Sequence, residues 1–395
     1  MKLLFLVRDF LPATRPDVRV LFGRKLRERG VVTDIAGVRR ADGPPPGDWE
    51  GGREITEPDP HGPFVRAWRL ISLDLRLLRG ADGYDAVIVR DKMLTAAIAL
   101  LLVPRRKVFY WMSFPFAEED AVRAGMATRG RLFRIGLGLR ARLTGWLLYR
   151  WIAPRVAHLF VQSPAMARMV ASKAPRCAPM TPVPMGFDPA MVAAFEPPAR
   201  EPVPGRVMLG YLGAVDVIRR IDFILEVLAW LRAHHPETDF RLLVVGDGST
   251  PGETAAFRGR IADLGLQAQV EITGALPMLD AWNRISTVDI GLSTVPRGVV
   301  FDVSSPTKAV EYLALGLPAV VNDIPDQEAL MAHTHAGRCA PMEVEAFGRA
   351  ILEVAADLEG CRARASAAYP SVVAERSYDV LADRVLARLR ETLAG

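Results

Sequence analysis

The sequence has 395 residues, half of them apolar and 24% charged, with a formal net charge of +5. This composition is typical of globular chains of two or three domains, and it excludes collagen, long coiled coils and low-complexity chains. Three scattered cysteines, Cys177, Cys339 and Cys361, are too few for a disulfide framework or a zinc site, which predicts a reducing, cytoplasmic compartment.

No apolar run is long enough to cross a bilayer. The longest, at 93–104, has about half of the ~20 residues that a transmembrane helix needs. The apolar run at 3–7 is too short for a signal-peptide core and predicts a first β-strand. The small positive charge indicates an anionic partner.

Short apolar strands alternate with helical patterns along the chain, which predicts an α/β protein with parallel sheets. A Pro- and Gly-rich stretch at 182–205 separates two series of such units. We therefore expect two Rossmann-like domains, at 1–185 and 186–377, and a closing helix at 378–395. Strands are expected at 3–7, 86–90, 107–112, 158–162, 207–212, 241–245, 270–273, 288–293 and 319–322, and helices at 218–234, 254–264 and 306–315.

Ligands of doubly wound domains bind at the carboxyl ends of parallel strands, so the strand-to-helix turns are the expected place of the chemistry. Val-Val-Gly-Asp-Gly at 244–248 places Gly246 and Asp247 directly after a predicted strand. Glycine lets a ligand approach the backbone closely. The spacing to Gly252 differs from the dinucleotide fingerprint, so this turn predicts a nucleotide contact other than NAD, or an ordinary tight turn.

A helix start with free amides is predicted by the run Ser-Ser-Pro-Thr-Lys that begins at Ser304. Ser305 is a good N-cap, and the proline after it suits the first helical position, so the helix dipole and the first amides form an anion site. Ser304, Lys308 and Glu311 fall on one helical face. We expect Lys308 to bind a diphosphate and Glu311 to bind ribose hydroxyls; an ordinary capped helix with a solvated Lys-Glu pair is the alternative.

Two arginines, Arg219 and Arg220, stand near the start of the helix expected at 218–234. Cations at a helix N-terminus oppose its dipole. An anionic ligand would explain them, and a solvated surface pair is the alternative.

These motifs, in this order, resemble the GT-B glycosyltransferases of family 4, which are retaining enzymes that use nucleotide sugars. The resemblance is best over 207–330, through the turn at 213–222, Val-Gly-Asp-Gly, Ile-Thr-Gly at 272–274, Val-Asp-Ile-Gly-Leu at 288–292 and the segment 305–318. It implies the GT-B fold, with two facing Rossmann-like domains and a cleft between them. The first domain would bind the acceptor and the second the nucleotide sugar.

Arg219 stands where the family has its diphosphate lysine, so the resemblance assigns catalysis to Arg219 and Lys308. The first Glu of the family's E-x7-E pair falls at Val303, which leaves Asp302 as a substitute for holding donor-sugar hydroxyls. The implied nucleotide-sugar contacts are Gly213, Gly246, Asp247, Asp302, Ser304, Ser305, Thr307 and Glu311.

The acceptor side is expected to include Arg15, Glu118 and Glu119, although the two glutamates fit a helix-capping role as well. No Asp-x-Asp triplet occurs, so we expect no metal ion and no other cofactor. The leaving diphosphate would be stabilised by cations and helix amides.

A basic segment at 121–157 holds eight arginines and no acid. Leu132, Ile135, Leu139, Leu143 and Trp146 form a stripe at helical spacing that should pack on the domain. Cations interleaved with apolar side chains on other faces are typical of a helix in a membrane interface; a nucleic-acid patch and a packed helix pair with solvated arginines are the alternatives. The expected membrane contacts are Arg131, Phe133, Arg134, Leu137, Arg142 and Trp151.

We therefore expect a cytoplasmic enzyme, peripherally bound to the inner face of the membrane. It would move a sugar from a nucleotide-diphosphate sugar to a lipid-linked saccharide acceptor in cell-surface polysaccharide or glycolipid synthesis. Its expected partners are the nucleotide sugar, that acceptor and an anionic membrane surface, with no nucleic acid. A non-catalytic partner subunit and a nucleotide-sugar epimerase of the same fold are the alternatives.

Overall fold

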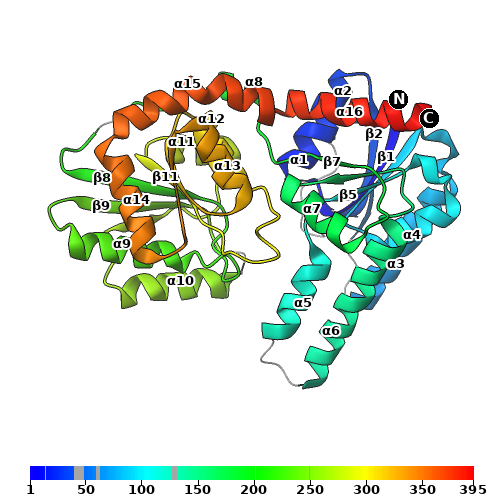
Figure 1. The fold of residues 1–395 in the computed structure, drawn as a ribbon, viewed down its shortest axis with the longest axis horizontal. Coiled ribbons are helices and arrows are strands. Elements are labelled where there is room, and N and C mark those ends of the chain that lie inside the picture. The colour runs from blue at the N-terminus through cyan, green and yellow to red at the C-terminus, as the bar shows by residue number, and fades with distance from the viewer. Residues whose placement is uncertain (14, 40–48, 59–62, 127–130, 201, 249) are drawn as a thin grey trace. The chain divides into compact units, whose positions relative to one another are not determined.

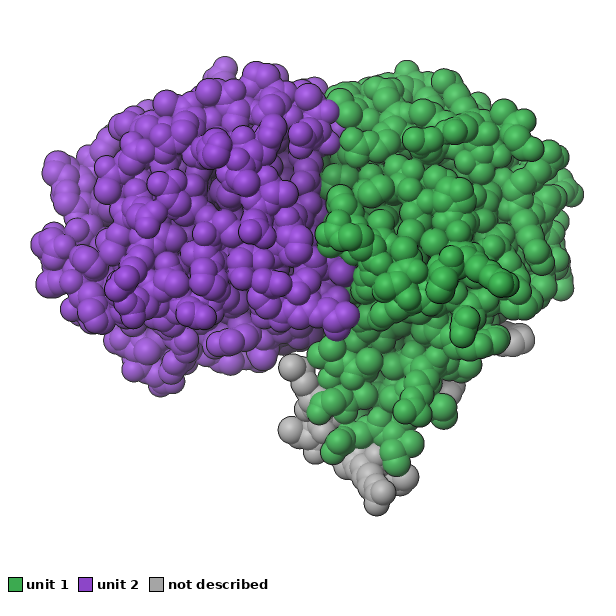
Figure 2. Space-filling model, viewed as in Figure 1, with its two compact units in different colours: residues 1–186, 378–395 green, residues 187–377 purple. Residues whose placement is uncertain are grey.

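The computed structural model divides the chain into two compact units (Figures 1 and 2). Unit 1 comprises residues 1–186 and 378–395, and unit 2 comprises residues 187–377. The structure describes all residues except 14, 40–48, 59–62, 127–130, 201 and 249, and it leaves the side chains of 63–68, 70, 126, 131 and 132 undescribed. The division falls one residue after the expected boundary, and the expected closing helix lies with unit 1.

Unit 1 is built on a parallel sheet whose central strands are mostly apolar, because helices cover both faces. The strands are β1 (Lys2–Leu11), β2 (Val32–Arg39), β3 (Glu54–Pro58), β4 (Ala86–Arg90), β5 (Val108–Met112), β6 (His158–Val161) and β7 (Met180–Pro182). Their order in the sheet is β3-β2-β1-β4-β5-β6-β7.

The helices of unit 1 lie around this sheet, except for one pair that extends beyond it (Figure 1). They are α1 (Pro16–Val18), the π-helix η1 (Arg19–Lys25), α2 (Leu26–Glu28), α3 (Pro63–Arg79), η2 (Ala81–Gly83), α4 (Met93–Leu102), η3 (Arg105–Lys107), α5 (Phe116–Met126), α6 (Arg131–Trp146), the π-helix η4 (Leu147–Ile152), α7 (Pro164–Lys173) and α16 (Tyr378–Ala394). α16 closes the core of unit 1, since Leu381, Val385 and Leu389 are buried in one cluster with side chains of β1 and η1.

Unit 2 repeats the plan with a six-stranded parallel sheet. Its strands are β8 (Arg206–Leu212), β9 (Asp239–Val245), β10 (Val270–Ile272), β11 (Ile290–Ser293), β12 (Ala319–Asn322) and β13 (Gly337–Ala340), in the order β10-β9-β8-β11-β12-β13. Its helices are α8 (Pro189–Ala193), α9 (Asp222–His234), α10 (Pro251–Asp263), α11 (Met278–Ile285), α12 (Thr307–Ala314), α13 (Pro325–Thr334), α14 (Val344–Ala356) and α15 (Leu358–Arg376).

Two hydrophobic clusters, one on each face of the second sheet, hold these helices in place. One joins α9 and α14 to the sheet through side chains such as Phe223 and Phe347, and the other joins α11, α12 and α15 through side chains such as Tyr312. The strand order reverses once in each unit, between β1 and β4 in unit 1 and between β8 and β11 in unit 2. These reversals are the topological switch points at which doubly wound folds bind ligands.

Candidate functional site

The carboxyl ends of β8 and β11 form the switch point of unit 2. The loop after β8 carries Gly213 and Arg219, and the loop after β11 leads into α12, which carries Lys308 and Glu311. The structure thus brings Arg219 to the same switch point as Lys308 and Glu311, although Arg219 lies about 90 residues before them in the chain.

Two glycines allow the turns after β8 and β9 to touch. Gly246 has a φ of +153°, and a Cβ at this position would lie 2.0 Å from the carbonyl oxygen of Gly213. The Gly213 amide donates to the Val245 carbonyl at 2.9 Å, and the Val215 amide donates to the Asp247 carbonyl at 2.9 Å. Both glycines therefore meet a backbone requirement, and they keep the turns bare where a ligand would approach.

The side chain of Lys308 lies over the Gly213 turn. A Cβ added to Gly213 would lie 3.0 Å from Cε of Lys308, and the Lys308 ammonium lies 5.0 Å from the centroid of the Tyr211 ring. Burial, with a smaller contribution from the like charge of Arg219, lowers the pKa of Lys308 from 10.5 to about 8. An anionic ligand would restore the charge that this environment disfavours.

Glu311 lies one turn further along α12. Burial raises the pKa of its carboxyl from 4.5 to about 7, while the charge of Lys308 acts in the opposite direction. No ion pair within 4.0 Å joins the two side chains in the described part of the chain. Both residues are partly exposed, so the predicted alternative of a solvated Lys-Glu pair stays open beside the donor site.

The Tyr312 hydroxyl holds α12 against both strand ends. It donates to the Leu292 carbonyl at 3.1 Å and accepts from the Leu212 amide at 2.9 Å. Since Leu212 ends β8 and Leu292 lies in β11, the helix that carries Lys308 is fixed to both sides of the switch point.

The predicted N-cap role of Ser305 is wrong. α12 begins at Thr307, with Pro306 as N-cap and no side-chain cap hydrogen bond. The Ser305 hydroxyl donates instead to Asp326 Oδ2 at 2.8 Å and accepts from Arg376 Nη1 at 3.2 Å. The Ser305 hydroxyl is thus bonded to the buried ion pair between Asp326 and Arg376, and it does not cap the helix.

The predicted helix start at 218 is also wrong. α9 begins at Asp222, after a turn in which Arg220 has a φ of +50°. The Arg219 amide donates to Asp216 Oδ1 at 2.7 Å, and its guanidinium pairs with the same carboxylate. Arg219 therefore does not oppose a helix dipole. Asp216, to which the sequence analysis assigned no role, orients it.

The Asp247 carboxylate is fixed within its own turn. Its Oδ1 accepts from the Thr254 hydroxyl at 2.6 Å and from the Gly248 amide at 2.8 Å. These two hydrogen bonds lower the pKa of the Asp247 carboxyl. The side chain is thus an ionised acceptor at the carboxyl end of β9.

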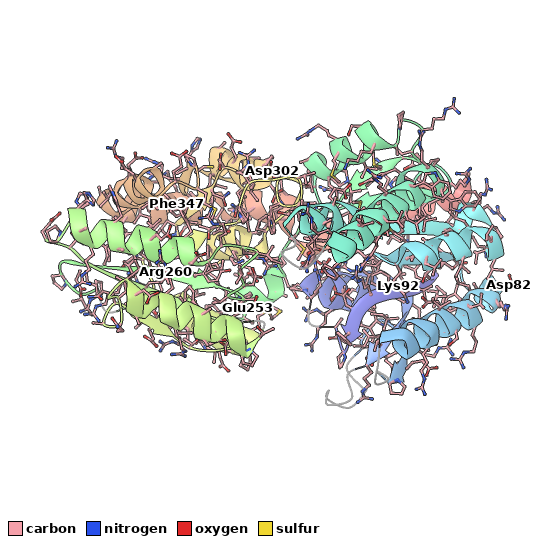
Figure 3. All side chains as sticks on the ribbon, turned by 90° about the horizontal axis from the view of Figure 1, so that it is seen from below. Asp82, Lys92, Glu253, Arg260, Asp302 and Phe347 are labelled. Carbon is pink, nitrogen blue, oxygen red and sulfur yellow. The ribbon has the colours of Figure 1, made fainter. Side chains whose placement is uncertain are left out.

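Two residues of the loop before α12 have local partners. Asp302, labelled in Figure 3, accepts from Nε of Arg297 at 2.7 Å, and the Ser304 hydroxyl donates to the Phe301 carbonyl at 2.7 Å. Thr307 is the first residue of α12 and is partly buried. For Asp302 to bind sugar hydroxyls, its ion pair with Arg297 would have to be shared or exchanged.

The predicted acceptor-side glutamates of unit 1 lie at the start of α5. Oε1 of buried Glu118 accepts from the Tyr149 hydroxyl and from Nζ of Lys173, both at 2.6 Å. Glu119 pairs with Arg123, one turn along the same helix. Glu118 thus joins α5 to η4 and α7, and the acceptor role of both residues stays a prediction.

A buried charge network that the sequence analysis missed lies at the switch point of unit 1. Fully buried Arg90 donates from Nη1 to Asp17 at 2.6 Å and from Nε to Asp9 at 3.0 Å, and Arg15 donates to the other oxygen of Asp17 at 3.2 Å. A single arginine at the end of the apolar strand 86–90 was the available signal. Arg15, which was predicted to lie on the acceptor side, therefore belongs to this charge network, and its acceptor role stays a prediction.

The next residue extends this network. Asp91 has a φ of +55°, and its carboxylate accepts from the Ser113 amide at 3.0 Å and pairs with the Ser113 hydroxyl. Burial raises the pKa of the Asp91 carboxyl. Asp91 is thus a non-glycine residue with a left-handed backbone and a buried carboxylate, and such backbone strain is often found at functional sites.

The basic segment corresponds to α5, α6 and η4, with α5 and α6 running side by side beyond the sheet of unit 1 (Figure 1). The predicted packed stripe is wrong, because Ile135, Leu139, Leu143 and Trp146 are 55%, 66%, 63% and 56% exposed. α6 extends past the sheet, so nothing in the described part of unit 1 covers this face.

The predicted membrane contacts divide into two groups. Phe133, Arg134 and Arg142 are exposed on α6, and Leu137 is partly exposed. Trp151 is partly buried beneath the Arg155 guanidinium, which lies 4.3 Å from its ring centroid. The side chain of Arg131 lies outside the described part of the structure.

Residues 206–357 match the family model described as Glycosyl transferases group 1. This segment contains the switch point of unit 2 with Gly213, Lys308 and Glu311. No curated protein sequence matches the chain.

Solved structures match both units at nearly full length. A sucrose-phosphate synthase from Thermosynechococcus elongatus superimposes with a TM-score of 0.77 at 16% identity, covering 100% of this chain and 99% of that chain. The fold is GT-B. HepE of Anabaena in complex with UDP and glucose matches this GT-B chain with a TM-score of 0.71 at 16% identity, covering 99% and 100% of the two chains.

WaaG, a glycosyltransferase involved in lipopolysaccharide biosynthesis, matches the GT-B chain with a TM-score of 0.70 at 16% identity, covering 97% of this chain and 98% of that chain. The group 1 domain match and these glycosyltransferase neighbours support a glycosyltransferase enzyme. Among the described residues, no helix combines the length and the apolarity needed to cross a membrane.

Proposed function

We propose that this protein moves a sugar from a nucleotide-diphosphate sugar bound by unit 2 to a lipid-linked saccharide acceptor bound by unit 1, in cell-surface polysaccharide or glycolipid synthesis. In this proposal it is a family 4 enzyme that retains the anomeric configuration. We call α12 the donor helix. The observation that carries the proposal is the place of Lys308 and Glu311 on the donor helix at the switch point, where both are partly buried and form no ion pair with each other.

Each charge suits one part of the donor. A diphosphate beside Lys308 would restore the ammonium charge, and Arg219 would add a second cation held in place by Asp216. Ribose hydroxyls would donate to ionised Glu311. Both interactions would favour the charged forms that partial burial disfavours, so donor binding would relieve a cost already present in the free protein.

The same groups would serve the reaction. As the bond between sugar and diphosphate breaks, negative charge develops on the leaving diphosphate, and fixed cations stabilise it without reorganising. Lys308 and Arg219 supply these cations, so the proposal includes no metal ion or other cofactor. HepE, whose structures contain UDP and UDP-glucose, shares the fold, which supports a UDP-sugar as the first donor to test.

The acceptor would reach unit 1 from a membrane surface. The exposed side chains Ile135, Leu139, Leu143 and Trp146 form one face of α6, and exposed Arg134 and Arg142 accompany them. Apolar side chains flanked by cations are suited to a shallow position in an anionic membrane interface. Two other arginines of the segment are neutralised locally, since Arg123 pairs with Glu119 and Arg140 with Asp120.

Donor turnover tests the enzymatic part. The protein is incubated with UDP- and GDP-sugars, and released nucleoside diphosphate is measured with and without lipid-linked saccharide. Lys308→Met and Glu311→Gln should each weaken donor binding by roughly 1–3 kcal/mol, whereas the exposed control Arg349→Gln on α14 should not. Donor affinity unchanged in both site variants would refute the site; sugar inversion without nucleotide release would indicate an epimerase, and binding without turnover a non-catalytic subunit.

Vesicle flotation tests the membrane part. Wild type should float with vesicles that contain anionic lipid, less so at high salt. Leu139→Gln with Trp146→Gln should abolish flotation, Arg134→Glu with Arg142→Glu should weaken it, and Leu279→Gln on α11 of unit 2, which is 52% exposed, should not change it. A wild type that stays soluble at low salt would remove the membrane from the proposal.

A further inference from the structure

Arg376 ends α15 and is buried beside the start of the donor helix. Its Nη2 donates to Asp326 Oδ1 at 2.9 Å, and its Nη1 donates to Asp326 Oδ2 at 3.3 Å and to Ser305 Oγ at 3.2 Å. The Ser305 hydroxyl also donates to Asp326 Oδ2, at 2.8 Å. All three residues are less than 10% exposed. We call these three residues the Arg376 clamp.

The clamp costs more to bury than apolar side chains would. Apolar replacements of similar volume for a buried ion pair often leave stability unchanged or higher, so stability alone does not account for three buried polar groups here. A guanidinium that binds a carboxylate through two nitrogens supplies fixed geometry instead. That geometry matters at this place because Ser305 lies three residues before Lys308, and the donor helix has no side-chain cap of its own.

The backbone of Arg376 is bound as well. Its carbonyl accepts from the Phe187 amide at 3.1 Å, and Phe187 pairs with Ser377 in a parallel bridge. Phe187 and Ser377 are the first and last residues of unit 2. Arg376 therefore connects the start of the donor helix to both places where the chain enters and leaves this unit.

We propose that Arg376 is a positioning residue for the donor helix. Through Ser305 and Asp326 it fixes the first turn of α12, and with it the place of Lys308 over Gly213. Through its carbonyl it couples donor binding to the backbone at 187 and 377. The coupling to donor binding rests on the donor site proposed above, whereas the fixing of the helix start does not.

A paired variant separates positioning from folding. Arg376→Met with Asp326→Leu removes both charges, so no unpaired buried charge remains. Arg376→Lys keeps the charge but loses the two-nitrogen geometry. The matched control is Arg349→Met with Glu345→Leu, which removes an exposed ion pair from α14 of the same unit.

Amide hydrogen exchange of the ligand-free protein tests the fixing directly. In the double variant Arg376→Met with Asp326→Leu, amides at 305–311 should exchange about tenfold faster or more, while the exchange of amides in β8 and β9 stays as in wild type. Arg376→Lys should lie between the two, and the α14 control should match wild type. Unchanged exchange at 305–311 in a folded variant would overturn the proposal. If the Met/Leu pair does not fold, the Arg376→Lys protein decides the question by the same criterion.

Titration with UDP and GDP tests the coupling. The Kd of the nucleotide that binds wild type should rise about tenfold in the Met/Leu variant, as for a misplaced charge-assisted contact. Nucleotide should slow exchange at 187 and 377 in wild type and not in the variant. Equal Kd values with altered exchange would overturn the coupling alone. Failure of wild type to bind either nucleotide would refute the donor site, and the ligand-free exchange would still decide whether Arg376 fixes α12.

Discussion

The affinity of unit 2 for a nucleoside diphosphate should fall as the pH rises above 8. In the free protein the pKa of Lys308 is lowered to about 8, so its ammonium is about 90% protonated at pH 7 and about 10% at pH 9. A bound diphosphate favours the charged form, so binding above pH 8 must take up a proton. The expected loss between about pH 7 and pH 9 is roughly tenfold in Kd, or about 1.4 kcal/mol.

Isothermal titration calorimetry over this pH range measures the effect and the proton uptake together. Lys308→Arg is the matched control, because its guanidinium stays protonated throughout. Its affinity should not fall in this window, and the ionisation of Glu311 above about pH 7 should raise it slightly. A wild-type Kd that is constant from about pH 7 to pH 9, or a loss of the same size in Lys308→Arg, would refute the assignment of the diphosphate to Lys308.

Three further changes have defined outcomes. Because the pKa of Glu311 is raised from 4.5 to about 7, the folded protein loses stability as the pH rises between these two values, and the loss is complete above about pH 7. Glu311→Gln should therefore unfold at higher urea at pH 8, by roughly 1–3 kcal/mol, yet bind nucleotide more weakly. A lower stability at pH 8 would contradict this. In the same assay, Gly246→Ala should lower the free energy of unfolding by roughly 2–4 kcal/mol, since its Cβ would meet the Gly213 carbonyl. The control Gly259→Ala in α10, with open space around it, should raise that free energy by up to about 1 kcal/mol. Equal effects of the two substitutions would mean that the turns after β8 and β9 do not touch. Glu118→Gln should lower the free energy of unfolding by about 1–3 kcal/mol and leave nucleotide affinity unchanged, and a changed affinity would speak against its place in the framework of unit 1.

The buried strands could be predicted because parallel sheets need continuous apolar runs. The strands expected at 86–90 and 319–322 have those bounds in the structure. β2 was missed because it carries two buried polar residues, Thr33 and Asp34. The burial of Asp34 depends on Arg53 and Tyr84, which bind its carboxylate. From sequence alone a carboxylate in a buried strand is unfavourable, because its hydrogen-bonding partners are not known.

The direction of an amphipathic face could not be predicted. Periodicity identified the stripe of Ile135, Leu139, Leu143 and Trp146, but whether a stripe meets a core depends on what lies opposite, and α6 extends past its sheet. Ser305 shows the same limit at the site. Its local pattern is that of an N-cap, but its hydroxyl accepts a hydrogen bond from Arg376, 71 residues later in the chain.

The return of α16 to unit 1 determines the order in which the chain can fold during its synthesis. Unit 2 is a continuous segment that is complete once residue 377 has left the ribosome. Unit 1 begins first but must wait for Leu381, Val385 and Leu389, which are made after the whole of unit 2 and fill the space against β1 and η1. Until then the apolar surface under α16 is open to water, and a ribosome that stalls within codons 378–395 would carry a complete unit 2 and an incomplete unit 1.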